Sequence, residues 1–296
     1  MLKRRPISNN NEYLSNSIAQ ALVFTSEINR DSGKDVTLDL SDIGDISPAL
    51  ALSLIVYCSK CGKKIQFVNS GNKRDCIFLN EQGLKPDNLR GSAFKAVLEG
   101  FADKTFTPII SFPADFDSDY KDIVSSLVED LVIRQSGIKT NVATGIKYII
   151  EETLDNITEH SRTDRGFIFA RTNPDKHYID ISIADRGITL LGSYNTLPDN
   201  EISDDLEAIK AANRGISSKN LPEAENRGYG IYTSKKMIID GLKGQYMMIS
   251  GNACFMKDNQ YDNFFSLPED CRWEGTIVSF RFCYDVPDFN YINFIE

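Results

Sequence analysis

Apolar side chains recur every three to four residues over residues 138–160, and this spacing predicts one long amphipathic helix. Its apolar stripe consists of Ile146, Ile149, Ile150, Leu154 and Ile157. Glu152, Asn156 and Glu159 fall on the opposite stripe, because residues three or four positions apart lie together on a helix. One face of this helix can therefore be buried, while the other presents two carboxylates and a carboxamide.

The same periodicity divides the rest of the chain into short elements. Helices are predicted over residues 12–28, 118–135, 203–213 and from about 229, and strands over 105–112, 166–172, 177–185, 246–251 and 276–284. Residues 35–69 are typical of strand, turn, helix and strand, which implies a parallel pair joined by a right-handed crossover. Residues 76–100 are expected to form a second segment of helix and strand.

Two stretches lack this regularity. Residues 190–227 are polar, with few periodic signals beyond the helix at 203–213, and a stretch of this length inside a compact domain is usually functional. We expect it to be a mobile lid. The tail, residues 286–296, is apolar and is expected to dock on the sheet or on a second subunit.

Length and charge limit the class of protein. A chain of 296 residues suggests one or two domains, and the net charge of −9 argues against a general nucleic-acid binder. Residues 1–10 are basic but lack the apolar run of a signal peptide, and the longest apolar stretch, 46–58, is too short to span a bilayer. We therefore expect a soluble, cytoplasmic protein that contacts neither membranes nor nucleic acid.

The cysteines do not predict a metal site. Six cysteines are scattered along the chain, and only Cys58 and Cys61 have the spacing of a redox or metal pair. No second pair completes a zinc site, and neither of the two histidines is near in sequence. We interpret Cys58 and Cys61 as small, partly buried residues at a helix end.

Three short motifs follow the long helix in sequence. The strand at 178–185 runs into Asp185-Arg186-Gly187, and an Arg-Gly-Tyr-Gly-Ile stretch at 227–231 opens a helix. A Glu-Gly-Thr turn at 274–276 leads into an alternating strand. Two glycines at a helix start let free backbone N–H groups and the positive end of the helix approach a phosphate.

With these motifs in this order, the chain resembles the GHKL ATPase superfamily over roughly residues 105–284. EETLDNITEHS at 151–161 is similar to the N box, DRGIT to the G1 box, RGYGI to the G2 box, and EGT to the last Gly-Thr motif. The resemblance implies an α/β fold, a two-layer sandwich of the Bergerat type with a mixed sheet covered by helices on one face. That ATP-binding domain would span residues 104–296.

The resemblance also implies roles for single residues, with ATP and Mg²⁺ as ligands. Asn156 would hold the magnesium ion, Glu152 would be the general base, and Asp185 would accept a hydrogen bond from the adenine amino group. Gly187 would let the backbone approach the base, Gly228 and Gly230 would cradle the phosphates, Thr276 would support Asp185, and Arg227 would stabilise charge on the γ-phosphate. Thr189, Tyr229 and Ile231 complete the set of nucleotide contacts within these motifs.

One position departs from the family pattern. Thr189 stands where the G1 box usually has its second glycine, and a β-branched residue is stiffer than glycine. We expect nucleotide binding to survive, because Asp185 and Gly187 remain. The opening of the lid, and with it the turnover rate, is where Thr189 is expected to have its effect.

The N-terminal residues 1–103 are expected to form a separate domain. Their strand–helix–strand unit resembles the core of a STAS domain, the fold of anti-sigma-factor antagonists. Ser47-Pro48 stands where that family has an Asp-Ser pair with a phosphorylatable serine. Proline fits the first turn of the helix, and Ser47 is expected to cap it. The sequence therefore predicts a STAS-like scaffold without the phosphoswitch.

Three functions fit these features. The first is an ATP-driven conformational switch that hydrolyses ATP slowly and controls a protein partner. The second is a serine or threonine kinase of the anti-sigma-factor type, in which Glu152 activates a partner's hydroxyl. The third is a non-catalytic module with a decayed pocket, for which Thr189 is the main support. A histidine kinase is disfavoured, because such kinases carry a phosphoacceptor histidine on a helix upstream of the ATPase domain. No histidine precedes His160 in this chain. His160 is interpreted as a helix-end residue with local hydrogen bonds, and a homodimer is compatible with the sequence.

Overall fold

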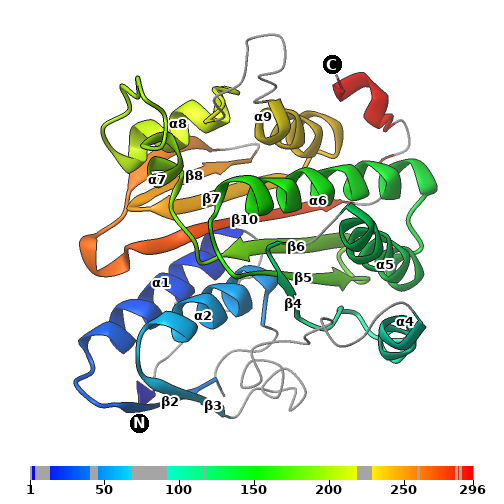
Figure 1. The fold of residues 1–296 in the computed structure, drawn as a ribbon. Helices are drawn as coiled ribbons and strands as arrows, with labels where there is room; N and C mark the ends of the chain where they lie inside the picture. The colour runs from blue at the N-terminus through cyan, green and yellow to red at the C-terminus, as the bar shows by residue number, and fades with distance from the viewer. Residues whose placement is uncertain are drawn as a thin grey trace.

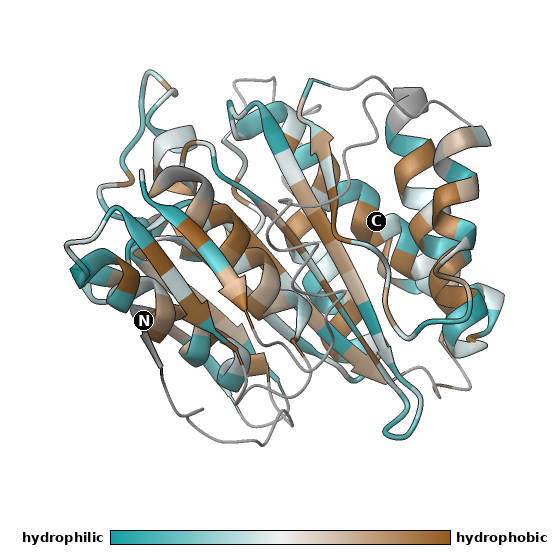
Figure 2. Ribbon diagram, turned by 90° about the horizontal axis from the view of Figure 1, so that it is seen from below, coloured by the Kyte–Doolittle hydropathy of each residue, from teal (hydrophilic) through white to brown (hydrophobic). Residues whose placement is uncertain are grey.

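The computed structural model describes residues 2–3, 14–40, 46–68, 92–115, 118–218, 229–258, 261–283, 286 and 289–295. Its elements stack in layers (Figure 1): helices, a large sheet, two further helices, and a small sheet. Figure 2 shows hydrophobic runs along the strands, alternating hydrophobic and hydrophilic bands on the helices, and hydrophilic residues in many turns. The protein is therefore a mixed α/β structure, as the periodicity predicts.

The large sheet has seven strands in the order β4-β5-β6-β10-β7-β8-β9. Its strands are β4 (Ile110–Pro113), β5 (Arg165–Asn173), β6 (Tyr178–Asp185), β7 (Gln245–Gly251), β8 (Ala253–Lys257), β9 (Asp262–Ser266) and β10 (Trp273–Cys283). Every neighbouring pair among these strands is antiparallel, so the expectation of a mixed sheet is wrong. Short connections join β5 to β6, β7 to β8 and β8 to β9, and such links favour antiparallel pairing because they leave no room for a crossover.

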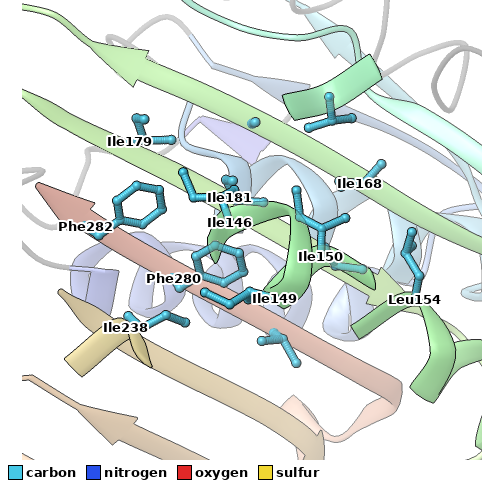
Figure 3. Close-up of a cluster of buried hydrophobic side chains, with 14 of the residues drawn as sticks. Ile146, Ile149, Ile150, Leu154, Ile168, Ile179, Ile181, Ile238, Phe280 and Phe282 are labelled. Atoms are coloured by element: carbon cyan, nitrogen blue, oxygen red, sulfur yellow. The ribbon is translucent and has the colours of Figure 1, made fainter. Parts of the chain in front are cut away.

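One face of the sheet is covered by α5 (Ser118–Ser136), α6 (Thr140–His160) and α9 (Tyr229–Lys236). The apolar stripe of α6 is buried: Ile149, Ile150 and Leu154 are each 0 % exposed. Figure 3 shows them against Phe280 and Phe282 of β10 and the isoleucines of β5 and β6. The predicted amphipathic helix is confirmed, and its polar stripe is left for the site described below.

The opposite face of the sheet is also covered, by α1 (Leu14–Arg30) and α2 (Pro48–Lys60). A single hydrophobic cluster joins Leu50 and Leu54 of α2 to Phe167 and Phe169 of β5 and to Ile277 of β10. Helices therefore lie on both faces of the sheet: those of residues 104–296 lie on one face, and α1 and α2 of the N-terminal segment cover the other, which the sequence did not predict. Strand alternation gives the reason, because the second face of these strands is apolar too and must be buried.

The N-terminal unit follows its prediction more closely. Strands β2 (Asp35–Asp39) and β3 (Lys64–Val68), which precede and follow α2 in the sequence, pair in parallel. β1 (Leu2–Lys3) is parallel to β2. Ser47 caps α2, its hydroxyl accepting from the Leu50 N–H at 3.2 Å, and Pro48 occupies the first turn. Within the predicted 76–100 segment, residues 76–91 lie outside the described residues, and α4 (Ser92–Glu99) packs on α5.

Buried polar pairs fix the register of β6 against β10. Arg281 donates to both carboxylate oxygens of Asp180, at 2.6 and 2.7 Å, and its guanidinium lies 4.0 Å from the centre of the Tyr178 ring. The hydroxyls of Ser182 and Ser279 are 2.7 Å apart two residues further along. A slip by one residue would leave these groups unpaired in an apolar layer, so the register is strongly specified.

Residues 190–218 contain more regular secondary structure than the sequence predicts. Helices α7 (Leu190–Tyr194) and α8 (Asp205–Asn213) pack on each other, and α8 covers β7 and β8 with Ala208 and Ile209 fully buried. The stretch thus contains two packed helices, and its role as a mobile lid stays a prediction. The helix at 203–213 is confirmed, and residues 219–227 of the predicted lid lie outside the described residues.

The tail docks on helices rather than on the sheet. Phe289 is 4 % exposed and lies against Gly145 of α6 and Gly241 of the π-helix Met237–Gly241. Asn141 donates to the Phe289 carbonyl. No helix among the described residues is both long and apolar enough to cross a membrane.

The cysteine pair shows no sign of reactivity. Burial raises the pKa of the Cys58 thiol, and the neighbouring Cys61 adds to this rise. Cys61 is the C-cap of α2, and its thiol points at the Cys58 carbonyl, 3.5 Å away. Both are free thiols at the helix end, as the sequence predicts.

Candidate functional site

A cavity of about 280 Å³ lies between α6, α7, α9 and the large sheet. Seven residues named from the sequence line it: Glu152, Asn156, Asp185, Thr189, Gly230, Ile231 and Thr276. They come from the long helix, the end of β6, the start of α7, the start of α9 and the bulged part of β10. Residues more than 120 positions apart in the sequence thus meet around one space.

Asp185 ends β6 as a buried carboxylate, 3 % exposed. Its Oδ1 accepts from the Gly187 N–H at 2.7 Å, and its Oδ2 accepts from the Thr276 N–H at 3.2 Å. Two backbone donors, one in the turn after β6 and one in β10, therefore fix the plane of the carboxylate.

Gly187 and Gly275 allow the chain segments around Asp185 to come close. A Cβ at Gly187 would stand 1.8 Å from the Ser161 carbonyl oxygen, and the Ile188 N–H donates to that same oxygen at 2.7 Å. From the sequence we expected Gly187 to let the backbone approach the base of a ligand. In the structure the space is taken by the end of α6. Gly187 therefore joins that helix to β6, and Gly275 (φ +80°) lies against Asp185 in the same way.

Thr276 sits where β10 is bulged against β7. Its hydroxyl is 3.1 Å from that of Ser250, which donates to the Gly275 carbonyl at 3.0 Å and accepts from the Leu190 N–H at 2.9 Å. The bulge re-aims side chains at the site and is stabilised by this hydroxyl network. Ser250 was missed from the sequence, because it lies in a strand with no motif around it.

Glu152 lies at the other end of the cavity. A Cβ at Gly230 would be 2.2 Å from its Oε2, so the carboxylate occupies the space that the glycine leaves at the start of α9. Burial raises the pKa of the Glu152 carboxyl; a hydrogen bond from the Tyr148 hydroxyl opposes the rise, and the nearby charge of Asp155 adds to it. A carboxyl with a raised pKa is a better proton acceptor near neutral pH than an exposed carboxyl, because its pKa lies closer to that pH.

Asn156 lies one helical turn after Glu152. Its Nδ2 donates to the Glu152 carbonyl at 2.8 Å, which turns the amide NH₂ toward the helix. The side-chain oxygen is then the atom offered to the cavity, because the amide has only these two polar ends. That is the oxygen a hard cation such as Mg²⁺ would use.

Thr189 has an ordinary role in the structure. It is the N-cap of α7 with φ −71° and ψ 171°, and its hydroxyl accepts from the Gly192 N–H at 3.1 Å. Any L residue adopts this backbone conformation, so the glycine of the family pattern is not needed for the geometry seen here. Thr189 instead stabilises the start of α7 beside the cavity.

His160 has distant partners. Its Nδ1 is 3.4 Å from the Ser193 hydroxyl of α7 and 3.2 Å from the Ser218 hydroxyl after α8, and those two hydroxyls are 2.8 Å apart. His160 ends α6, as interpreted from the sequence, and its ring also reaches two serines that are distant in sequence. Neither serine could be found from the sequence, because only the packing of α7 and α8 brings them to the helix end.

The charge of the lining is one-sided. Four carboxylates, Glu152, Asp155, Glu159 and Asp185, line the cavity, and no Lys or Arg does so among the described residues. Lys121 of α5, which does not line the cavity, pairs with Asp155: its Nζ lies 2.9 Å from both carboxylate oxygens. An anion bound here would need a cation to accompany it.

Part of the predicted site is not described by the structure. Arg227 and Gly228 lie outside the described residues, as does the side chain of Tyr229. Gly230 and Ile231 line the cavity as expected. Metal-binding groups of three or more His, Cys, Asp or Glu side chains are absent from the described part of the chain.

Comparison of the chain with protein-family models, curated proteins and solved structures found no match in any of the three.

Proposed function

We propose that this protein binds Mg-ATP in the cavity between α6 and the sheet and hydrolyses it slowly, as GHKL ATPases do. Support comes above all from one observation: the buried Asp185 carboxylate, fixed by two backbone N–H groups, lines the same cavity as Glu152 and Asn156. The resemblance implies these same three residues, with Asp185 as the acceptor for adenine, Glu152 as the general base and Asn156 as the magnesium ligand. The antiparallel sheet departs from the Bergerat plan that the resemblance implies, and α1 and α2 add a second covered face to it.

The two ends of the cavity suit the two ends of ATP. Near Asp185 the lining includes Ile183, Ile188, Met248 and Val278, which suit a flat base with one amino group to donate. At the other end lie the polar side chains of Glu152 and Asn156, beside Gly230 and Ile231 at the start of α9. An N-terminus of a helix favours phosphate through its free N–H groups and its dipole.

A magnesium ion fits these donors. Bound Mg²⁺ keeps several waters and takes one or two protein oxygens plus phosphates, so the single side-chain oxygen of Asn156 is a sufficient protein contribution. The ion would neutralise phosphate charge in a cavity lined by carboxylates. Asn156 holds its oxygen in place through the hydrogen bond that its NH₂ makes to the helix.

Glu152 would take a proton from the attacking water. Its raised pKa and its place beside Gly230, at the start of α9, suit a base that acts next to the phosphate end of the cavity. Slow hydrolysis at such a site would limit how long the nucleotide-bound state lasts.

Residues of α6, α7 and α9 all line the cavity, so a bound nucleotide would contact all three helices. The nucleotide-bound protein would then present a changed surface to a protein partner.

Magnesium dependence tests this function directly. Wild type is expected to bind ATP at least about tenfold more tightly with Mg²⁺ than with EDTA, because the cation offsets the acidic lining. Asn156→Ala should lose most of this difference and keep its affinity in EDTA. Asn195→Ala, an exposed asparagine after α7, is the control and should match wild type. Titration calorimetry measures all three, and equal wild-type affinities in the two buffers would contradict the proposal.

Gly230→Ala should slow hydrolysis by about 10- to 100-fold, because the added methyl group would displace the Glu152 carboxylate that now lies 2.2 Å from its position. The fold should tolerate the change, since the flexible end of a glutamate can move aside. Phosphate release and thermal unfolding are the two measurements. In the double variant with Glu152→Gln the two losses should not add. Fully additive losses would show that Gly230 acts elsewhere.

A further inference from the structure

The cluster formed by His160, Ser193 and Ser218 is not used by the proposed hydrolysis. Its three side chains come from the end of α6, from α7 and from the turn after α8, and all three line the cavity. The pairwise distances of 3.4, 3.2 and 2.8 Å place the ring nitrogen and both hydroxyls within reach of one another. Ser193 is 4 % exposed, so the cluster is built into the wall of the cavity.

The packing around the cluster fixes its position. The Tyr194 hydroxyl donates to the Ile216 carbonyl at 2.6 Å, and Tyr194 itself is 2 % exposed. This bond holds the turn that carries Ser218 against α7. The hydroxyl of Ser218 is therefore positioned by contacts other than those it makes within the cluster.

The cluster lies near the Asp185 end of the cavity. His160 directly precedes Ser161, whose carbonyl oxygen touches Gly187 and accepts from the Ile188 N–H, within three residues of Asp185. His160 is also one helical turn, about 6 Å, beyond Asn156 along α6. A nucleotide with its base at Asp185 and its phosphates toward Asn156 and Glu152 would place its sugar beside this cluster, between the base and the phosphates.

We propose that His160, Ser193 and Ser218 form a ribose subsite that recognises the sugar hydroxyls of ATP, and this inference rests on the function proposed above. A ribose hydroxyl is both donor and acceptor, and it is the group by which a protein distinguishes a ribonucleotide from a deoxyribonucleotide. Serine hydroxyls can rotate to donate or accept, and the imidazole can do either according to its tautomer. The cluster can thus exchange a bond within itself for a bond to the sugar.

Affinities for ATP, 2′-deoxy-ATP and 3′-deoxy-ATP, all with Mg²⁺, test the assignment. Wild type should bind ATP about tenfold more tightly than at least one deoxynucleotide, because a polar group built to pair with a hydroxyl is left unpaired without it. Ser218→Ala should weaken ATP binding to the level of that deoxynucleotide and leave the deoxynucleotide affinity unchanged. Ser193→Ala provides a second variant with the same expected pattern.

Thr158→Ala is the matched control, because it removes an exposed hydroxyl two residues before His160 on α6. It should retain the wild-type preference. Equal wild-type affinity for all three nucleotides would overturn the ribose subsite while leaving ATP binding intact. Parallel weakening of all three in Ser218→Ala and Ser193→Ala would also overturn it, since that is the effect of a structural latch. Absence of binding to any nucleotide would overturn the proposed ATPase and the subsite together.

Discussion

Asp185→Asn is expected to lower the affinity for Mg-ATP by at least about 100-fold. The carboxylate faces two backbone donors, the N–H groups of Gly187 and Thr276. An asparagine has one acceptor oxygen, so its NH₂ would face one of these donors or the amino group of adenine. A buried donor opposite a donor costs about 1–3 kcal/mol on each side, and the charge of the acceptor is lost as well.

Calorimetric titration with Mg-ATP measures this loss, and thermal unfolding without nucleotide shows how much of it is structural. Asp164→Asn is the control, because Asp164 is exposed. Its contact with Arg186, at 3.5 Å, is a surface ion pair that contributes little to stability. It should bind ATP as wild type does. Wild-type affinity in Asp185→Asn would mean that the base lies elsewhere in the cavity.

Glu152→Gln is expected to reduce ATP hydrolysis by about 10²- to 10⁴-fold, the usual contribution of a general base. Glutamine keeps the shape that fits beside Gly230, so ATP binding should change little. Glu151→Gln is a close control: Glu151 is the preceding residue, but its carboxylate accepts from Ser125 of α5. Phosphate release under single-turnover conditions separates the chemical step from binding.

The dependence of hydrolysis on pH gives a second readout of Glu152. The base acts as the carboxylate, so the wild-type rate should rise with pH through the pKa of Glu152, which burial holds above its ordinary value. The rate should be level above that pKa. Glu152→Gln should lack this acidic limb, since glutamine does not titrate. An unchanged limb in the variant would assign it to another group.

Local pattern was enough to predict most single elements. The 3.6-residue period of Ile149, Leu154 and their neighbours identifies α6, and the period of two in Ile179, Ile181 and Ile183 identifies β6. Asn156 and Asp185 were found because each belongs to a short motif on such an element. The same signals gave β2, α2 and β3 with parallel pairing.

Tertiary packing was not predictable in the same way. The periodicity shows that β5 has a second apolar face but does not say that α1 and α2 cover it. Strands β8 and β9 were missed, since β9 is largely exposed and carries little apolar alternation. The hydroxyls of Ser193 and Ser218 reach His160 only through the contact between α7 and the turn after α8. Each of these depends on partners distant in sequence.

The second layer of helices restricts where a phosphoryl group could be passed in cis. Ser47 starts α2 next to Ile46, whose carbonyl accepts from Arg171 of β5 at 3.1 Å, on the face of the sheet that α6 does not cover. Its hydroxyl is engaged with the Leu50 N–H, and the residue is 6 % exposed. The sheet therefore stands between this serine and the cavity as a wall one strand layer thick. A phosphoryl group could therefore not pass directly from the cavity to Ser47 of the same molecule.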